Sequence, residues 1–203
     1  MMTGRRFSMS VRAAIAALAL LSVLVAGCGY RQQTWQLANA HGLLPALQFT
    51  LTQSDGRTVR AQDFRGKTTV LFFGYTHCPD ECPTTLATLA RAIKSLGPDA
   101  DRVRVLFVTV DPARDTSEAM MKYTRLFGPE FVGLRGDPQQ LQLLTRRYRV
   151  SYGLGPPDAS GDYEVTHSNA IFVFDGAGDA VLVGSEANGV QAFIHDLKQL
   201  LAA

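Results

Sequence analysis

The feature that most constrains the fold is a pair of cysteines that directly follows a continuous apolar run. Residues 69–75 have the length and composition of a strand buried on both faces. Cys78 and Cys82 come next, and from Pro83 onward apolar residues recur at helical spacing. This order indicates an α/β fold in which two thiols lie where a core strand meets its helix.

The rest of the chain alternates predicted strands and helices. Core strands are expected at 103–110, 131–134, 170–174 and 180–183, and helices at about 83–96, 116–127, 137–149 and 189–201. Strands at 47–52 and 58–61, joined by a turn at 54–56, form an edge hairpin, and residues 150–163 form a long loop. The pattern predicts an α/β fold, a thioredoxin-like central β-sheet with helices on both faces and an N-terminal β-hairpin extension.

The N-terminal segment has the features of an export signal. Three arginines and no acidic residue precede a run of apolar or small residues at 13–26. The run ends in Leu-Val-Ala-Gly-Cys, which resembles a bacterial lipobox, so residues 1–27 are predicted to be a lipoprotein signal peptide and Cys28 the lipidated residue. An ordinary cleavage site near Cys28 and an uncleaved anchor are the alternatives.

Three segments and a location follow from this. Residues 28–45 are polar and irregular and are predicted to be a membrane tether, and residues 46–203 to be the thioredoxin-like domain that carries the two remaining cysteines. The lipid would hold the protein on the periplasmic side of the bacterial cell envelope, at a membrane that we expect to be the cytoplasmic one. Without residues 1–27 the chain keeps 17 basic and 18 acidic residues. This near-neutral balance offers no electrostatic footprint for nucleic acid.

The remaining cysteines, Cys78 and Cys82, need an explanation other than structural cross-linking. A disulfide that closes so short a loop would add only about 2 kcal/mol to the free energy of unfolding on the chain-entropy model. In a helix, four residues rise about 6 Å and nearly complete one turn, so both sulfurs would face the same side. The positive end of the helix dipole favours thiolates, which attack disulfides and bind soft metals. Copper suits such a site better than structural zinc, which wants four protein ligands.

One of four histidines is placed to add a third ligand. His41 lies in the predicted tether and His195 on the polar face of the last helix, so both are expected in solvent. His77 adjoins Cys78, but on leaving an extended strand its side chain should point away from that of its neighbour. His167 precedes the strand at 170–174, where the chain of a thioredoxin-like fold passes the dithiol and usually carries a cis-proline. On spacing alone a structural histidine remains the more common outcome.

Three sequence blocks together resemble the Sco/SenC family of copper chaperones for cytochrome c oxidase assembly. They are Gly-Tyr-Thr-His-Cys-Pro-Asp-Glu-Cys-Pro-Thr-Thr-Leu at 74–86, Val-Asp-Pro-Ala-Arg-Asp-Thr at 110–116 and Tyr-Glu-Val-Thr-His-Ser at 163–168. The resemblance implies that Cys78, Cys82 and His167 bind Cu(I) or Cu(II). It also implies delivery to the dinuclear copper centre of cytochrome c oxidase subunit II, with a further periplasmic copper chaperone or thiol reductase as an additional partner.

Neighbouring acidic residues are candidates to support the ligands. Asp80 lies between the cysteines, and Asp111 lies at the carboxyl end of a core strand, where such folds build sites. Asp111 is equally suited to forming a turn before a proline, and Asp115 is interpreted as a helix cap. Glu81 replaces the small or apolar residue often found in the family and adds negative charge, which could favour Cu(II) or change partner docking.

Two other functions remain open beside a metallochaperone without catalytic turnover. One is a thiol-disulfide reductase of the cell envelope that acts on oxidase cysteines, in which Cys78 attacks and Cys82 resolves. The absence of a proline near His167 counts against it. The other is a copper or redox sensor that uses the same residues without transferring the metal.

Overall fold

A computed structural model describes residues 34–159 and 161–202, and a compact folded unit begins at Trp35. The predicted signal peptide at 1–27 and the predicted lipidation site Cys28 lie outside the described residues. Within the described part of the chain, no helix has the length and apolar character that crossing a membrane requires.

The centre of the fold is an eight-stranded mixed sheet. Its strands are β1 (Ala38–Asn39), β2 (Thr50–Gln53), β3 (Thr58–Arg60), β4 (Thr68–Gly74), β5 (Val103–Thr109), β6 (Phe131–Arg135), β9 (Ile171–Phe174) and β10 (Ala180–Gly184), in the spatial order β1-β10-β9-β4-β5-β6-β2-β3. β4, β5 and β6 run parallel, whereas β9 is antiparallel to β4 and β2 is antiparallel to β6. The parallel strands at the centre therefore end at the same edge, and β4 and β5 end where the first two sequence motifs begin.

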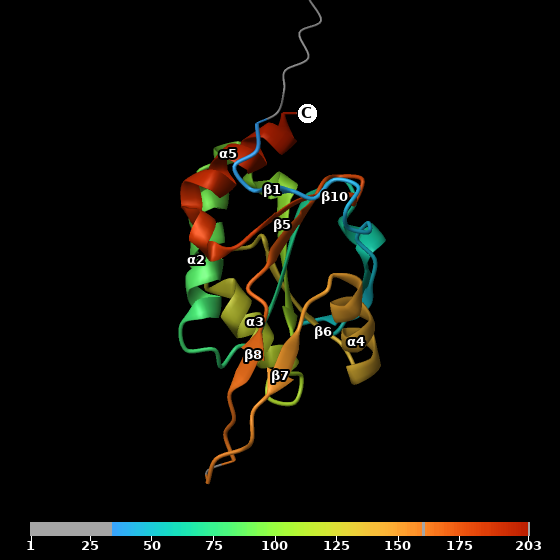
Figure 1. The fold of residues 1–203 in the computed structure, drawn as a ribbon, viewed down its shortest axis with the longest axis vertical. Coiled ribbons are helices and arrows are strands. Elements are labelled where there is room, and N and C mark those ends of the chain that lie inside the picture. Colours follow the sequence, from blue (N-terminus) through green and yellow to red (C-terminus); the bar gives the residue numbers. More distant parts are fainter. Residues whose placement is uncertain (1–33, 160, 203) are drawn as a thin grey trace, which may run out of the picture. The chain divides into compact units, whose positions relative to one another are not determined.

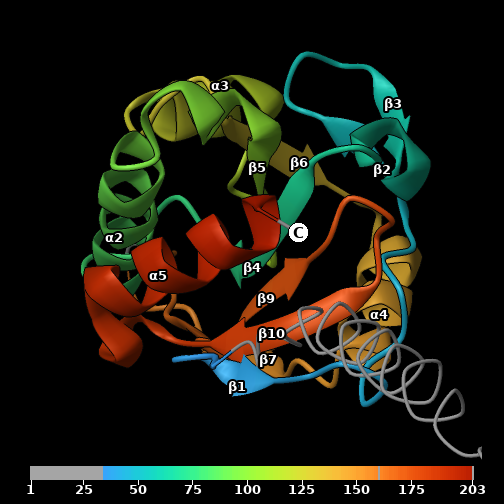
Figure 2. The same ribbon diagram turned by 90° about the horizontal axis from the view of Figure 1, so that it is seen from above.

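Helices cover both faces of this sheet, as predicted. They are α2 (Glu81–Lys94), α3 (Ser117–Arg125), α4 (Pro138–Arg147) and α5 (Gly189–Leu201), with short 3-10 turns η1 (Ala61–Phe64), η2 (Gly97–Arg102) and η3 (Glu186–Asn188). Figures 1 and 2 show α2, α3 and α5 on one side of the sheet and α4 on the other. The caps explain where two helices begin: the Thr116 hydroxyl accepts the Ala119 N–H, and Asp137 accepts the Gln140 N–H.

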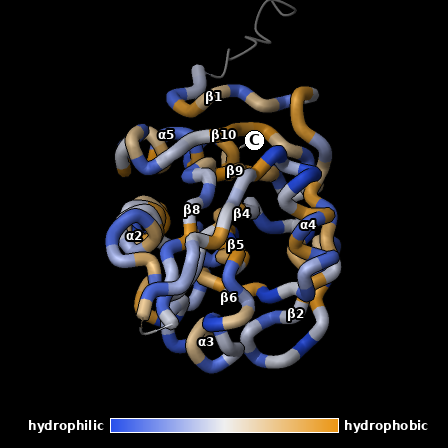
Figure 3. Tube along the Cα trace, turned by 60° about the horizontal axis from the view of Figure 1, so that its bottom comes forward, coloured by the Kyte–Doolittle hydropathy of each residue, from blue (hydrophilic) through white to orange (hydrophobic). Residues whose placement is uncertain are grey.

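The core forms because the central strands are apolar along most of their length. All seven residues of β4 are buried, which is why its sequence is a continuous apolar run without alternation. In β5, Leu106, Phe107 and Val108 are fully buried as well, and the Phe72 ring stacks on that of Phe107 at 6.2 Å between centroids. Figure 3 shows hydrophobic colour along β9 and β10 and hydrophilic stretches on the outer loops.

The N-terminal hairpin is present, but the folded unit starts earlier than the predicted boundary at residue 46. β2 and β3 pair at one edge of the sheet, with Leu51 opposite Val59. At the other edge β1 pairs with β10, and Leu37 is buried, so residues 35–45 are part of the domain rather than of a tether. Asp196 of α5 explains this attachment, because its buried carboxylate accepts the Leu37 N–H at 2.8 Å.

The segment predicted as a loop at 150–163 contains a strand. β7 (Tyr152–Leu154) pairs antiparallel with β8 (Val165–His167) in a separate two-stranded sheet, with Tyr152 opposite His167. We call β7, β8 and the residues between them the His167 hairpin. Among the residues that the structure describes, no strand pairing joins this hairpin to the eight-stranded sheet.

Candidate metal centre

The two thiols lie where β4 meets α2. Cys78 is partly exposed and precedes the helix, whereas Cys82 is its second residue and is completely buried. The Cys82 N–H points at the Cys78 sulfur, with 3.4 Å between nitrogen and Sγ. α2 starts at Glu81, two residues earlier than predicted, so Pro83 is its third residue, where a missing N–H costs nothing.

Gly74 makes room for the buried sulfur. A Cβ at this last residue of β4 would lie 2.6 Å from Cys82 Sγ and 2.7 Å from Cε2 of Phe107. Only a glycine allows the sulfur to pack this closely on the strand. Burial in this apolar contact also raises the pKa of the Cys82 thiol well above its usual range. The expectation that the helix N-terminus stabilises a thiolate is therefore wrong for Cys82 in the metal-free protein, because desolvation dominates.

His167 completes a group of three soft-metal ligands. Its Nε2 lies 3.3 Å from Cys82 Sγ, and one donor atom from each of Cys78, Cys82 and His167 lies within 4.8 Å of the others. Nδ1 lies 3.0 Å from the Ser168 carbonyl oxygen, which can only accept, so Nδ1 carries the proton. The lone pair of Nε2 is then directed at the thiols. Metal-binding histidines are commonly oriented in this way by a backbone carbonyl.

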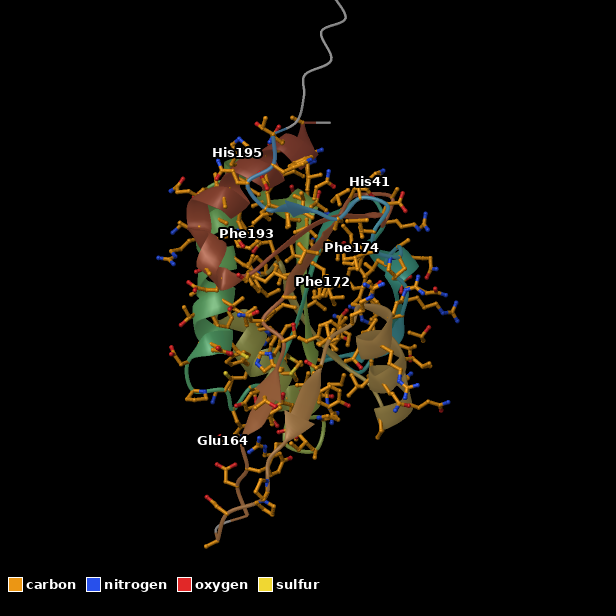
Figure 4. The ribbon with its side chains drawn as sticks, in the orientation of Figure 1. His41, Glu164, Phe172, Phe174, Phe193 and His195 are labelled. Carbon is orange, nitrogen blue, oxygen red and sulfur yellow. The ribbon has the colours of Figure 1, made fainter. Side chains whose placement is uncertain are left out.

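The other histidines are placed elsewhere. Figure 4 shows His41 and His195 at the end of the domain opposite to Glu164 of the His167 hairpin, so neither reaches the thiols. His195 is nevertheless not free in solvent, since its Nδ1 lies 2.7 Å from the buried Asp196. The His77 Nδ1 lies 3.4 Å from the buried carboxylate of Asp115.

The acidic candidates differ in position. Asp80 is exposed at the N-cap of α2, and its carboxylate accepts the Thr84 hydroxyl at 3.3 Å. Asp111 is buried and accepts the Tyr163 hydroxyl at 2.8 Å and Nε of Arg114 at 2.5 Å. Asp111 is therefore more than a turn-former, because it connects the end of β5 to the His167 hairpin.

Asp115 is the residue whose position the sequence did not reveal. Thr116, and not Asp115, caps α3. Asp115 is fully buried and accepts the Thr76 N–H at 3.0 Å, the Thr76 hydroxyl at 2.5 Å and the Thr109 hydroxyl at 2.5 Å. It fixes the loop between β4 and Cys78. The spacing of these residues in the sequence gives no sign that three neutral donors converge on one carboxylate.

The fold and the site together define a class. A thioredoxin-like domain with two thiols and an imidazole in place of the usual cis-proline segment is a soft-metal-binding member of that fold, and the donor set suits copper.

The comparisons with known proteins identify the family. Residues 41–202 match the family model described as SCO1/SenC, and the chain belongs to this family. It is 39% identical to the mitochondrial SCO2 homologue of Bos taurus over 157 residues, which cover 76% of this chain and 59% of that protein. The chain thus matches little more than half the length of that relative.

Solved structures show the same fold. ScoI of Bradyrhizobium japonicum, determined with copper bound, has a TM-score of 0.70 and 37% identity and covers 76% of this chain and 98% of that one. The solution structure of apo Sco1 from Thermus thermophilus has a TM-score of 0.72 and 36% identity over 84% of this chain and 99% of that one. The thioredoxin-like fold predicted from the sequence is confirmed.

Proposed function

We propose that this protein is a copper carrier that holds the ion between Cys78, Cys82 and His167. The observation that carries the proposal is the convergence of two sulfurs and a correctly oriented imidazole nitrogen within 4.8 Å. Thiolates and imidazole together select copper over hard cations. The copper bound to the related Bradyrhizobium ScoI supports the choice of metal.

The exposure of the ligands suggests how the ion is taken up and released. Cys78 is partly exposed, whereas Cys82 lies beneath it, so an incoming partner reaches Cys78 first. Each thiol gives up its proton when it binds the ion, and His167 presents Nε2 toward the thiols because its Nδ1 donates to the Ser168 carbonyl. A partner thiolate can then replace Cys78, and afterwards Cys82 and the imidazole, without oxidation or reduction of any group.

We further propose that the recipient is cytochrome c oxidase subunit II and its dinuclear copper centre. This rests on membership of the SCO1/SenC family and on the three motif blocks that resemble its copper chaperones. Export by the signal at 1–27 and lipid attachment at Cys28 would place the domain on the periplasmic side of the membrane, where that subunit is assembled. A second copper chaperone or a thiol reductase would load the ion or keep the thiols reduced.

The decisive experiment is a transfer assay. The reduced protein is loaded with copper, mixed with the apo form of an oxidase subunit II copper domain, and separated, and copper is measured in both fractions. Copper appearing in the acceptor supports delivery. A His167→Ala variant, loaded with copper but not yet mixed with the acceptor, should lack the thiolate-to-copper charge-transfer band.

The same two thiols also suit a reductase, because one is accessible and the other is buried and free to resolve a mixed disulfide. If the protein takes up no copper but reduces insulin disulfides or oxidised subunit II, the carrier proposal is wrong and the reductase is correct. If copper binds tightly but is never transferred, a sensor role replaces delivery.

A further inference from the structure

We infer that Arg114 is a positioning residue that holds the His167 hairpin against the body of the protein, and that it thereby controls the imidazole's contribution to the metal site. The inference rests on the proposed function, because it concerns the same three ligands. It assigns a task to a residue that binds no metal itself.

The need for such a residue follows from the fold. Cys78 and Cys82 are held by β4 and α2 in the core, but His167 is the last residue of β8, in the small separate sheet. Inside the hairpin, the Gly155 N–H bonds to the Glu164 carbonyl at 2.8 Å, and this bond does not join the hairpin to the core. The position of the imidazole relative to the sulfurs therefore depends on contacts between the hairpin and the core.

Arg114 provides several of these contacts. Its guanidinium lies over the Tyr163 ring at 3.7 Å from the centroid and pairs through Nη1 with Asp162, and both partners belong to the hairpin. On the core side its Nε donates to Asp111 at 2.5 Å. Asp111 in turn accepts the Tyr163 hydroxyl at 2.8 Å, so arginine and tyrosine share one buried carboxylate.

The same guanidinium reaches toward the imidazole through a second aromatic ring. It lies 5.8 Å from the centroid of the Tyr75 ring, and that ring meets the His167 ring edge-on at 6.0 Å. Tyr75 is buried directly after β4, so it is a fixed wall of the site. Arg114 thus lies between the outer part of the hairpin and the wall against which His167 packs.

The chemistry of this cluster favours arginine specifically. A guanidinium is planar, stacks on aromatic rings and donates from several nitrogens at once, whereas an ammonium group does not stack. The Arg114 side chain is only 17% exposed, and Asp111 is completely covered, so solvent weakens their attraction little. Loss of Arg114 would leave the buried Asp111 carboxylate with one hydroxyl donor and would remove both direct ties from Arg114 to the hairpin.

Loss of Arg114 should affect the binding of Cu(II) more than the binding of Cu(I). Without Arg114 the hairpin should sample positions in which Nε2 of His167 is out of reach, while the two thiols stay in place. Cu(I) accepts two thiolates, but Cu(II) gains from the imidazole. Arg114→Ala should therefore weaken Cu(II) binding by about 10–100-fold, the range seen when a group that orients a metal ligand is removed, and change Cu(I) binding much less.

The test is a double-mutant cycle in the full-length protein. Arg114→Ala and Arg114→Lys are each made alone and together with His167→Ala, and Cu(II) and Cu(I) affinities are measured by competition with chelators. We expect both substitutions to weaken Cu(II) binding when His167 is present and to have no further effect when it is absent. Arg102→Ala is the matched control, since that arginine pairs with Asp99 on the exposed η2 turn.

A second measurement uses the metal-free protein. Amide hydrogen exchange at Gly155 and Ser168 should be faster in Arg114→Ala, whereas amides of β4 should exchange as in the wild type. If Arg114→Ala does not fold, Tyr163→Phe removes only the hydroxyl bond to Asp111 and should change Cu(II) affinity and exchange in the same direction to a smaller extent.

The outcomes separate this inference from the proposed function. An equal loss of Cu(II) affinity in the presence and absence of His167, or unchanged exchange in the hairpin, overturns the positioning role of Arg114. If His167→Ala alone leaves Cu(II) binding unchanged, the ligand assignment itself is wrong, and the inference fails with it.

Discussion

The close approach of Cys82 to β4 can be tested by a single added methyl group. In Gly74→Ala the new Cβ would lie 2.6 Å from Cys82 Sγ and 2.7 Å from Phe107 Cε2. Ordinary contact distances are about 3.5–4.0 Å, so the sulfur or the strand must move by roughly 1 Å. Both neighbours are fully buried, Cys82 against β4 and Phe107 within β5. Overpacking of this kind costs about 1–3 kcal/mol.

Two measurements follow from that displacement. For a domain of this size each kcal/mol lowers Tm by about 2–4 °C, so calorimetry should show Tm lower by roughly 2–12 °C. A metal site tolerates ligand shifts of only about 0.2 Å, so Cu(II) titration should show a weakened and shifted charge-transfer band. The effect on copper should persist at low temperature, where the variant is fully folded.

Gly176→Ala is the control, because a Cβ there would meet its nearest neighbour, the Gly66 backbone, at an ordinary 3.7 Å. It should bind copper like the wild type. If Gly74→Ala keeps both the Tm and the copper spectrum of the wild type, the packing of Cys82 against β4 that we describe is incorrect.

Three further predictions concern the groups around and away from the thiols. Because burial raises the pKa of Cys82, its thiol keeps its proton at neutral pH and releases it when copper binds. Apparent copper affinity should therefore rise with pH, and calorimetric titration in two buffers should detect the released proton. Asp115→Ala removes the acceptor for the Thr76 N–H and should lower both copper affinity and, by about 1–3 kcal/mol, the free energy of unfolding in urea. Asp196→Ala leaves the buried Leu37 N–H without its acceptor and should lower the free energy of unfolding similarly, but copper affinity measured by chelator competition should not change.

Much of the fold could be predicted because its signals are local. The run of seven buried residues in β4 can only be a strand covered on both faces, and the cysteines after it identify the start of α2. His167 could be expected near the thiols because the strand order of the fold brings the segment before β9 to the same edge. The structure places it 3.3 Å from Cys82.

The remainder depends on contacts between residues far apart in the sequence. Asp115 looks like a helix cap next to Thr116, and only the folded chain brings Thr76, 39 residues earlier, against its carboxylate. β7 and β8 are only three residues long each, and β7 has a glycine at its centre, so no period marks them as strands. Residues 35–45 looked like a tether because β1 is only two residues long, and a carboxylate 159 residues away fixes Leu37.

The separation of the site into a core part and an outlying part has a consequence for how such a protein can change over generations. Substitutions in β4 or α2 alter folding and the positions of the thiols together, since Cys82 is a fully buried residue of α2 and Cys78 lies directly before this helix. The His167 hairpin forms its own small sheet, so its length and composition can vary while the eight-stranded sheet stays intact. The placement of the imidazole can therefore be adjusted with little effect on the stability of the eight-stranded sheet.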